Sequence, residues 1–143
     1  MSVYHIWPRS FCDGNGDGIG DLKGILSKLD YIKDLGVDAI WFSPLYPSPN
    51  ADYGYDIANY RDIAPDYGTL DEFKTLLDEA HKRGLRVIMD LVVNHTSNQH
   101  TWFQQFCNAH QNGDTSSPYY EFYTYAEAPI NGRTFQPIPG SKD

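Results

Sequence analysis

Apolar residues recur at three- and four-residue steps in two stretches of the chain. In the first, from Asp21 to Leu35, the stripe consists of Leu22, Ile25, Leu26, Leu29 and Ile32. Such a stripe predicts an amphipathic helix with one face on a core. The second stretch runs from about Leu70 to Arg83, and Thr69 and Glu72 have the spacing of a capping box at its start. We therefore predict two core-facing helices.

Three short apolar runs alternate with these helices, namely Val3–Trp7, Ala39–Phe42 and Val87–Val93. Each run is too short for a helix and is almost continuously apolar, which is typical of parallel strands buried on both faces. The order strand, helix, strand, helix, strand gives two βαβ units that share a strand. The pattern therefore predicts an α/β fold with a parallel sheet.

The remaining segments have no clear period. Residues 43–67 form a long loop rich in Pro, Tyr, Asn and Asp, and residues 111–143 are rich in Gly, Pro and Tyr. Between them, Trp102, Phe103 and Phe106 predict one short amphipathic helix. Three parallel strands alone would leave exposed sheet edges, so we expect the chain to be part of a larger sheet or barrel.

Composition and charge exclude several classes of function. The 143 residues carry a formal net charge of −8, with a pI of about 4.9, which disfavours nucleic-acid and anionic-membrane partners. There is no apolar run of membrane-spanning length and no secretory signal pattern at the N-terminus. The two cysteines, Cys12 and Cys107, are far apart, which predicts reduced thiols and a cytoplasmic location.

Oxygen-bearing groups fall on alternate positions of one glycine-rich loop. They are Asp13, Asn15, Asp17, the backbone carbonyl of Ile19, and Asp21. This spacing matches a calcium-binding loop through its ninth position, and crowded carboxylates repel one another unless a hard cation draws them together. The twelfth position is Gly24 instead of a bidentate Glu, and a strand precedes the loop, so it is not an EF-hand. We expect a structural Ca²⁺ or Mg²⁺ ion; the alternative is a solvated acidic turn.

Polar and aromatic residues gather where the predicted strands end. Asp90 lies within the third apolar run, His95 follows that run, and the loop after the second run holds Asp52 and Tyr55. Ligands of parallel α/β proteins bind at the carboxyl ends of strands. Aromatic rings beside carboxylates suit a pyranose, whose apolar face stacks while its hydroxyls bond to the acids. The alternatives are a structural ion pair for Asp90, a core histidine and a packing tyrosine.

Five stretches of the chain, in this order, resemble the α-amylase superfamily of glycoside hydrolases, and within it the oligo-1,6-glucosidase and α-glucosidase group. The resemblance covers roughly residues 3–107. The stretches are Tyr4 to Phe11, the loop from Asp13 to Asp21, Ala39 to Pro44, Gly54 to Asp56, and Asp90 to His95. The resemblance implies a (β/α)8 TIM barrel. Residues 1–100 would form its first three βα units, and residues 101–143 the start of the inserted domain B.

The resemblance also implies roles for the strand-end residues. His95 would contact the 6-hydroxyl of the glucose at the cleavage subsite, Tyr55 would stack on that ring, and Asp90 would hold the hydrogen-bond network. Asp52 would grip the sugar at the non-reducing end, and Tyr53 stands where the family more often has Met or Asn. The cation would sit in the N-terminal loop, as in the α-glucosidase group.

The implied activity is retaining hydrolysis of α-1,4 or α-1,6 glucosidic bonds in short oligosaccharides. The family's nucleophile and acid/base follow the fourth and fifth strands, so no catalytic residue is expected among these 143 residues and the chain alone is expected to be inactive. Its expected partners are an oligosaccharide substrate and the C-terminal part of the barrel. A transglycosylase of the sucrose isomerase or trehalose synthase type, a non-catalytic carbohydrate- or cation-binding module, and a non-enzymatic transporter-associated ectodomain stay open as alternatives.

Overall fold

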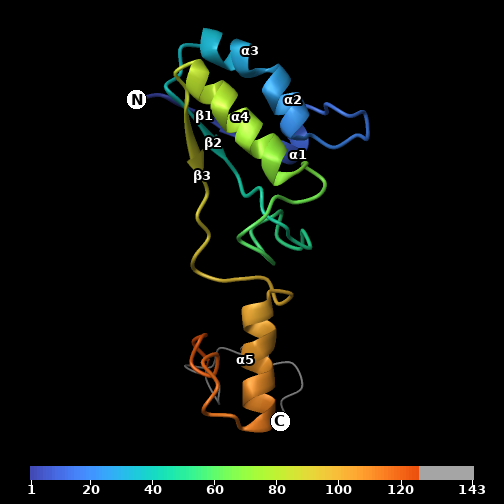
Figure 1. Ribbon diagram of the computed structural model, residues 1–143, viewed down its shortest axis with the longest axis vertical. Helices are drawn as coiled ribbons and strands as arrows, with labels where there is room; N and C mark the ends of the chain where they lie inside the picture. The colour runs from blue at the N-terminus through green and yellow to red at the C-terminus, as the bar shows by residue number, and fades with distance from the viewer. Residues whose placement is uncertain (126–143) are drawn as a thin grey trace, which may run out of the picture.

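Strands and helices alternate along the chain, as the hydrophobic pattern predicts. The computed structural model describes residues 1–125. The part of the predicted start of domain B that covers residues 126–143 therefore lies outside the described residues. The elements are β1 (Val3–Ile6), α1 (Pro8–Phe11), α2 (Leu22–Ser27), α3 (Leu29–Asp34), β2 (Ala39–Phe42), α4 (Leu70–Lys82), β3 (Arg86–Met89) and α5 (Thr101–Asn112) (Figure 1). The α/β fold class is confirmed.

The three strands form one parallel sheet in the order β1-β2-β3. Ile6 pairs with Phe42, which pairs with Met89, and this row faces the helices. The neighbouring row, His5, Trp41 and Ile88, is exposed on the opposite face. The prediction that both faces are buried is therefore wrong for residues 1–125, because the helices of this part cover only one face.

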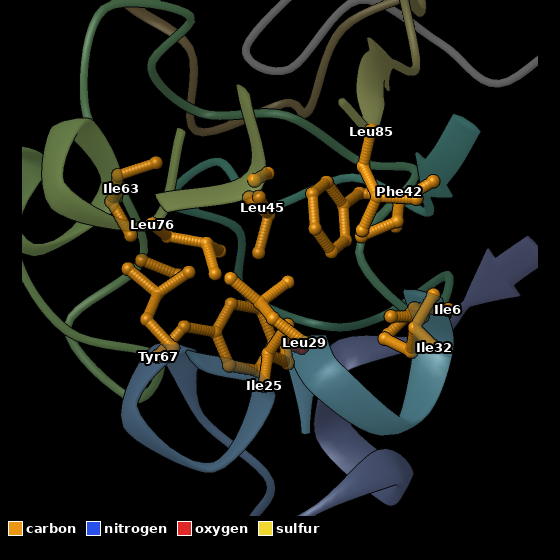
Figure 2. Packing of buried hydrophobic residues seen from close by; sticks show 14 residues of the cluster. Ile6, Ile25, Leu29, Ile32, Phe42, Leu45, Ile63, Tyr67, Leu76 and Leu85 are labelled. Atoms are coloured by element: carbon orange, nitrogen blue, oxygen red, sulfur yellow. The ribbon is translucent and has the colours of Figure 1, made fainter. Parts of the chain in front are cut away.

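The core lies between the sheet and the helices α2, α3 and α4. Both predicted apolar stripes point into it, and the side chains interdigitate with residues of the long loop such as Leu45, Ile63 and Tyr67 (Figure 2). Helix α4 begins with the predicted capping box, since Thr69 Oγ1 accepts from the Glu72 amide and the Glu72 carboxylate accepts from the Thr69 amide. The capping box and the burial of its apolar stripe thus both stabilise α4.

The single helix predicted over residues 21–35 is two short helices. The hydroxyl of Ser27 donates to the Gly24 carbonyl (2.7 Å), which in a continuous helix would accept from the Lys28 amide. The Lys28 amide bonds to the Ile25 carbonyl instead (3.0 Å), and the helix breaks there. The prediction was wrong about continuity, although Ile25, Leu29 and Ile32 are all buried as expected.

Strand β3 is shorter than predicted. Its pairing with β2 ends at Met89, because β2 itself ends at Phe42 and the chain then turns into the long loop. Leu91 and Val93 are consequently exposed. Asp90 is therefore the first residue after the strand, not a residue within it as predicted.

The remaining features concern short or peripheral segments. Helix α1, with Pro8 at its first turn, was not predicted because four residues leave no periodic signal. The predicted helix around Trp102 is α5, which lies apart from the sheet at the end of the segment after β3 (Figure 1). Cys12 and Cys107 are both free. In residues 1–125 no helix has the length and apolar character needed to cross a bilayer.

Candidate functional site

Tyrosine hydroxyls tie the long loop after β2 to the segment that follows β3. Tyr55 donates to Asp90 Oδ2 (3.1 Å), Tyr46 donates to the Asp90 carbonyl (3.2 Å), and Tyr60 donates to the Val92 carbonyl (2.5 Å). The structure therefore brings the predicted residues Tyr55 and Asp90 into contact at the carboxyl end of the sheet. Asp90 is half-buried, and no Arg is among its hydrogen-bond partners in the described part of the chain.

His95 lies against the same loop. Its Nε2 is 2.9 Å from the Tyr55 carbonyl, and its Nδ1 is 3.2 Å from Asn94 Nδ2. A carbonyl only accepts, so Nε2 faces an acceptor, and the side-chain amide nitrogen of Asn94 only donates, so Nδ1 faces a donor. The imidazole is exposed, which argues against the core-histidine alternative. His95, Tyr55 and Asp90 thus form one connected group.

Asp56 shapes the loop that carries Asp52. Its buried carboxylate accepts from the Ser48 hydroxyl (2.7 Å) and from the amides of Ala51 (2.8 Å) and Asp52 (3.2 Å). Burial raises the pKa of Asp56, but the bonds from Ser48 and the two amides outweigh it and leave the pKa below its ordinary value. Asp56 is therefore a structural anchor, and the exposed side chain of Asp52 is presented next to it.

Several residues of this site carry no sequence signal of their own. Tyr46 and Tyr60 are two of many tyrosines in an aperiodic loop, and only the folded chain reveals that both reach the segment after β3. Burial raises the pKa of each, so both hydroxyls stay protonated donors at neutral pH. His5 and the buried Ser43 form a further pair (2.8 Å) at the ends of β1 and β2.

The arrangement presents hydrogen-bonding groups beside an aromatic ring. Burial, followed by contact with Asp90, raises the pKa of Tyr55, although a bond from Ser43 opposes this, and the phenol stays neutral. A carboxylate acceptor, an imidazole and an exposed carboxylate at Asp52 can bond the hydroxyls of a polyol, and the Tyr55 ring can meet its apolar face. The group therefore offers hydrogen-bonding side chains and one aromatic ring side by side at the carboxyl end of the sheet.

The acidic loop before α2 folds around its own amides. Asp13 accepts from the amides of Asn15, Gly16 and Gly18, and these bonds, above all the one from Gly18, hold the pKa of Asp13 below its ordinary value. Asp17 accepts from the Ile19 amide (2.8 Å). The loop thus holds its turn through hydrogen bonds from its own amides to its carboxylates.

Asp21 closes this loop and carries the observation that bears on a cation. Its Oδ1 caps α2 by accepting from the Gly24 amide (2.7 Å) and also accepts from the Gly14 amide (3.1 Å). Its Oδ2 is buried and has no hydrogen-bond partner among residues 1–125. Asn15 and Asp21 line a small hollow together with Asp66. In residues 1–125 no three His, Cys, Asp or Glu side chains lie close enough together to hold a metal ion by themselves. The predicted ligand set, however, also includes the side-chain amide of Asn15 and the backbone carbonyl of Ile19. The oxygen donors and the orphaned Oδ2 fit a hard cation.

Comparisons with known proteins show what this chain is similar to. The family described as alpha amylase, catalytic domain, matches residues 5–140. The oligo-1,6-glucosidase of Parageobacillus thermoglucosidasius is 55% identical over 123 residues, which are 86% of this chain and 21% of that protein. The glucan 1,6-alpha-glucosidase of Streptococcus pneumoniae serotype 4 is 52% identical over 127 residues, which are 89% of this chain and 23% of that protein.

Solved structures give the same fold. The trehalulose synthase of Pseudomonas mesoacidophila superposes with a TM-score of 0.78 at 49% identity, covering 86% of this chain and 21% of that one. The trehalose-6-phosphate hydrolase of Bacillus licheniformis superposes with a TM-score of 0.74 at 56% identity, covering 75% of this chain and 19% of that one. The chain thus spans about a fifth of the length of the proteins it matches.

Proposed function

This chain belongs to the α-amylase family of glycoside hydrolases, and we propose that it supplies the N-terminal, sugar-binding part of an enzyme that hydrolyses α-glucosidic bonds of short oligosaccharides. The parallel sheet and its helices are the N-terminal portion of the family's TIM barrel. The observation that carries the proposal is the contact of Tyr55 with Asp90, with His95 on the Tyr55 carbonyl.

Each predicted site residue has a role in this proposal. Tyr55 stacks on the terminal glucose, with its hydroxyl held by Asp90, and His95 and Asp52 bond the sugar hydroxyls. Tyr46 is a positioning residue, because its hydroxyl holds the Asp90 carbonyl (3.2 Å) and thereby the segment that carries the site. These residues bind and orient one glucose unit at the carboxyl ends of the strands.

Bond cleavage needs groups that we place in a later part of the barrel. A retaining glycosidase uses two carboxyl groups roughly 5–5.5 Å apart, one as nucleophile and one as acid/base. By family resemblance these follow the fourth and fifth strands, whereas β1, β2 and β3 are the strands of residues 1–125. We therefore propose that this chain alone is inactive and that it requires the remainder of the barrel.

The exposed sheet face supports this view of a larger barrel. The row His5, Trp41 and Ile88 is apolar enough to require cover in a stable protein. We propose that residues 1–100 are the first three βα units, that residues 101–143 begin domain B, and that further barrel strands enclose this row. The proposed location is cytoplasmic, in line with the two free cysteines.

Hydrolysis is the reaction that we propose over sugar transfer. The curated relatives named above are glucosidases, and a similar N-terminal part also occurs in a trehalulose synthase. Products separate the two reactions: hydrolysis of sucrose releases free glucose and fructose, whereas isomerisation returns a new disaccharide.

The test uses the full-length protein that carries this sequence. We expect its intact mass to be several times 16.3 kDa and its incubation with isomaltose or maltose to release glucose. Replacement of Tyr55 by Ala removes the stacking ring and should lower kcat/KM about 100-fold, whereas Tyr55→Phe removes only the bond to Asp90 and should cost about tenfold. Tyr31→Phe, on the exposed side of α3, is the matched control. Unchanged kcat/KM in Tyr55→Ala would contradict the proposed site.

We also propose that the loop from Asp13 to Asp21 holds a structural Ca²⁺, with Mg²⁺ as the alternative ion. The ion would neutralise the crowded carboxylates and give the orphaned Asp21 Oδ2 a partner. Its role is to fix the loop against the start of α2.

Thermal unfolding in EDTA and in excess Ca²⁺ tests this ion. A ligand present at 100 times its Kd stabilises the native state by about 2.7 kcal/mol, so EDTA should lower the melting temperature. Asp21→Asn keeps a good capping residue but loses the charge, and it should abolish the Ca²⁺ response. Asp34→Asn, at the exposed end of α3, is the control and should keep the response. A melting temperature that neither EDTA nor Ca²⁺ moves rules the ion out.

A further inference from the structure

Side chains at the carboxyl ends of all three strands belong to one chain of hydrogen bonds. His5 lies near the end of β1, Ser43 directly follows β2, and Asp90 directly follows β3. His5 Nε2 is 2.8 Å from Ser43 Oγ. The Tyr55 hydroxyl is 3.1 Å from Asp90 Oδ2, and a side-chain hydrogen bond joins Ser43 to Tyr55. Four side chains from distant parts of the sequence are therefore connected across the sheet.

The donors and acceptors give this chain one direction. Tyr55 donates its hydroxyl proton to Asp90 Oδ2. Burial raises the pKa of the Tyr55 phenol and the bond from Ser43 opposes that rise, which requires Ser43 to donate to the phenol oxygen. A serine hydroxyl has one proton, so the Ser43 oxygen is left to accept from His5. The donor at the start of the chain is therefore the Nε2–H group of His5.

The first two members of the chain are held by the sheet. His5 pairs with Trp41 in the register of β1 and β2, and the two rings stack with centroids 4.2 Å apart and an interplanar angle of 25°. Ser43 is buried, and its amide donates to the Ile6 carbonyl (2.9 Å). Supporting groups that are locked by packing and backbone bonds can orient the side chains that depend on them. The strand ends thus provide a fixed support for the phenol of Tyr55.

We propose that His5 is a positioning residue, which acts through Ser43 to hold the Tyr55 hydroxyl in the orientation that donates to Asp90. This inference rests on the proposed function, in which the Tyr55 ring meets the terminal glucose. The phenol is held on both sides, because its oxygen accepts from one neighbour while its proton is donated to the other. Without the donor at His5, the Ser43 proton can turn to other acceptors, and the Tyr55 ring loses part of its support.

Two substitutions of His5 separate its hydrogen bond from its packing. His5→Gln keeps a donor nitrogen at the same number of bonds from Cα but loses the ring on Trp41, whereas His5→Phe keeps a ring and loses the donor. In the full-length protein we expect His5→Phe and Ser43→Ala to lower kcat/KM for isomaltose about threefold to tenfold, and His5→Gln to stay within about twofold of the parent. If His5→Phe retains the parent value and His5→Gln loses activity, His5 only packs on Trp41 and the inference is wrong.

His81→Phe is the matched control for the change of a histidine to phenylalanine. His81 is exposed near the end of α4 that leads into β3, and it therefore lies at the opposite end of the strands from the site. We expect this variant to keep the kcat/KM of the parent. A loss equal to that of His5→Phe would mean that the effect is not specific to the chain of hydrogen bonds and would overturn the proposal.

The Tyr55→Phe variant tests whether His5 acts through the phenol. Because Tyr55→Phe already lacks the hydroxyl, adding His5→Phe to it should change kcat/KM by less than about twofold. The effect of His5→Phe alone should likewise be no larger than that of Tyr55→Phe. A further loss of more than about twofold in the double variant would show that His5 acts on another group and would contradict the proposal.

Long-range ¹H–¹⁵N spectra of the labelled histidine rings test the chain without measuring activity. The signal of His5 is the one that is absent from His5→Gln, and in the parent it should show a proton on Nε2. A neutral His5 ring whose proton is on Nδ1 would overturn the proposed direction. If the parent releases no glucose from isomaltose or maltose, the proposed function fails, and this spectrum still decides whether His5 donates to Ser43.

Discussion

Replacing Gly24 by Ala should destabilise the protein even though Gly24 lies inside a helix. Alanine is normally the better helix residue by about 1 kcal/mol. At this position, however, an added Cβ would lie 1.9 Å from the carbonyl oxygen and 2.5 Å from the carbonyl carbon of Cys12. Both are backbone atoms of the residue between α1 and the loop from Asp13 to Asp21, so no side chain can rotate away.

The magnitude follows from this overlap. A Cβ essentially never approaches another heavy atom closer than 3.0 Å, so α2 and the Cys12 backbone must separate by about 1 Å. Inserting one methyl into packed structure costs about 1–3 kcal/mol, and a contact with two backbone atoms belongs at the upper end of that range. The intrinsic helix gain offsets part of it, which leaves a net loss of about 2 kcal/mol. Separation would also weaken the hydrogen bond from the Gly24 amide to Asp21 (2.7 Å). That bond connects α2 to the last residue of the loop from Asp13 to Asp21.

Urea unfolding of the full-length protein, followed by far-UV circular dichroism with and without EDTA, measures this effect. Lys23→Ala is the control, because it changes an exposed residue of the same helix and removes only a surface pair with Glu72 (3.5 Å), which should cost less than about 1 kcal/mol. If Gly24→Ala unfolds at the same or a higher urea concentration than the parent, the close approach of α2 to Cys12 is not as described.

Two further predictions concern the core and pH. Phe42→Ala empties a fully buried position of β2 and should cost about 3–5 kcal/mol in the same unfolding assay; a loss below about 1 kcal/mol would place that ring outside the core. The Nδ1 of His100 caps α5 by accepting from the Trp102 amide (3.1 Å), and burial lowers the pKa of His100. Below pH 6.5 the unfolded chain then binds the proton more readily than the folded chain, so stability falls as the pH drops from about 6.5 toward the lowered folded pKa. His100→Asn keeps a capping oxygen but has no group that titrates here. The stability of this variant minus that of the parent should therefore be larger at about pH 5.5 than at pH 7.5, and a difference that does not change with pH would contradict the prediction.

Local patterns in the sequence determined the elements of this fold. The apolar stripes of α2, α3 and α4, the capping box at Thr69 and the three apolar runs follow from interactions between residues within a few positions of each other. The spacing of oxygen donors from Asp13 to Asp21 is likewise a property of nine consecutive residues. Short-range periodicity and turn chemistry suffice for such features, because their energetics depend on neighbours along the chain.

Other features cannot be read from the hydrophobic period of the sequence. The break at Lys28 depends on a hydroxyl bond from Ser27 that periodicity does not report. The end of β3 at Met89 depends on where its neighbour β2 stops. The exposure of the face that carries Trp41 depends on which side the helices cover. A hydrophobic run records that a strand is apolar, and the tertiary structure decides which of its faces is buried.

The candidate site divides in the same way. Its residue types were readable in the sequence, as was the place of Tyr55 and His95 after strands, whereas Asp90 was predicted within a strand and follows it instead. The contact of Tyr55 with Asp90 joins residues 35 positions apart, and the roles of Tyr46 and Asp56 as anchors appear only with it. Loop closure over such distances is specified by the packed core beneath the loop and not by any local preference. The sequence by itself thus determined which chemical groups this chain offers, and the tertiary structure decided which of them meet.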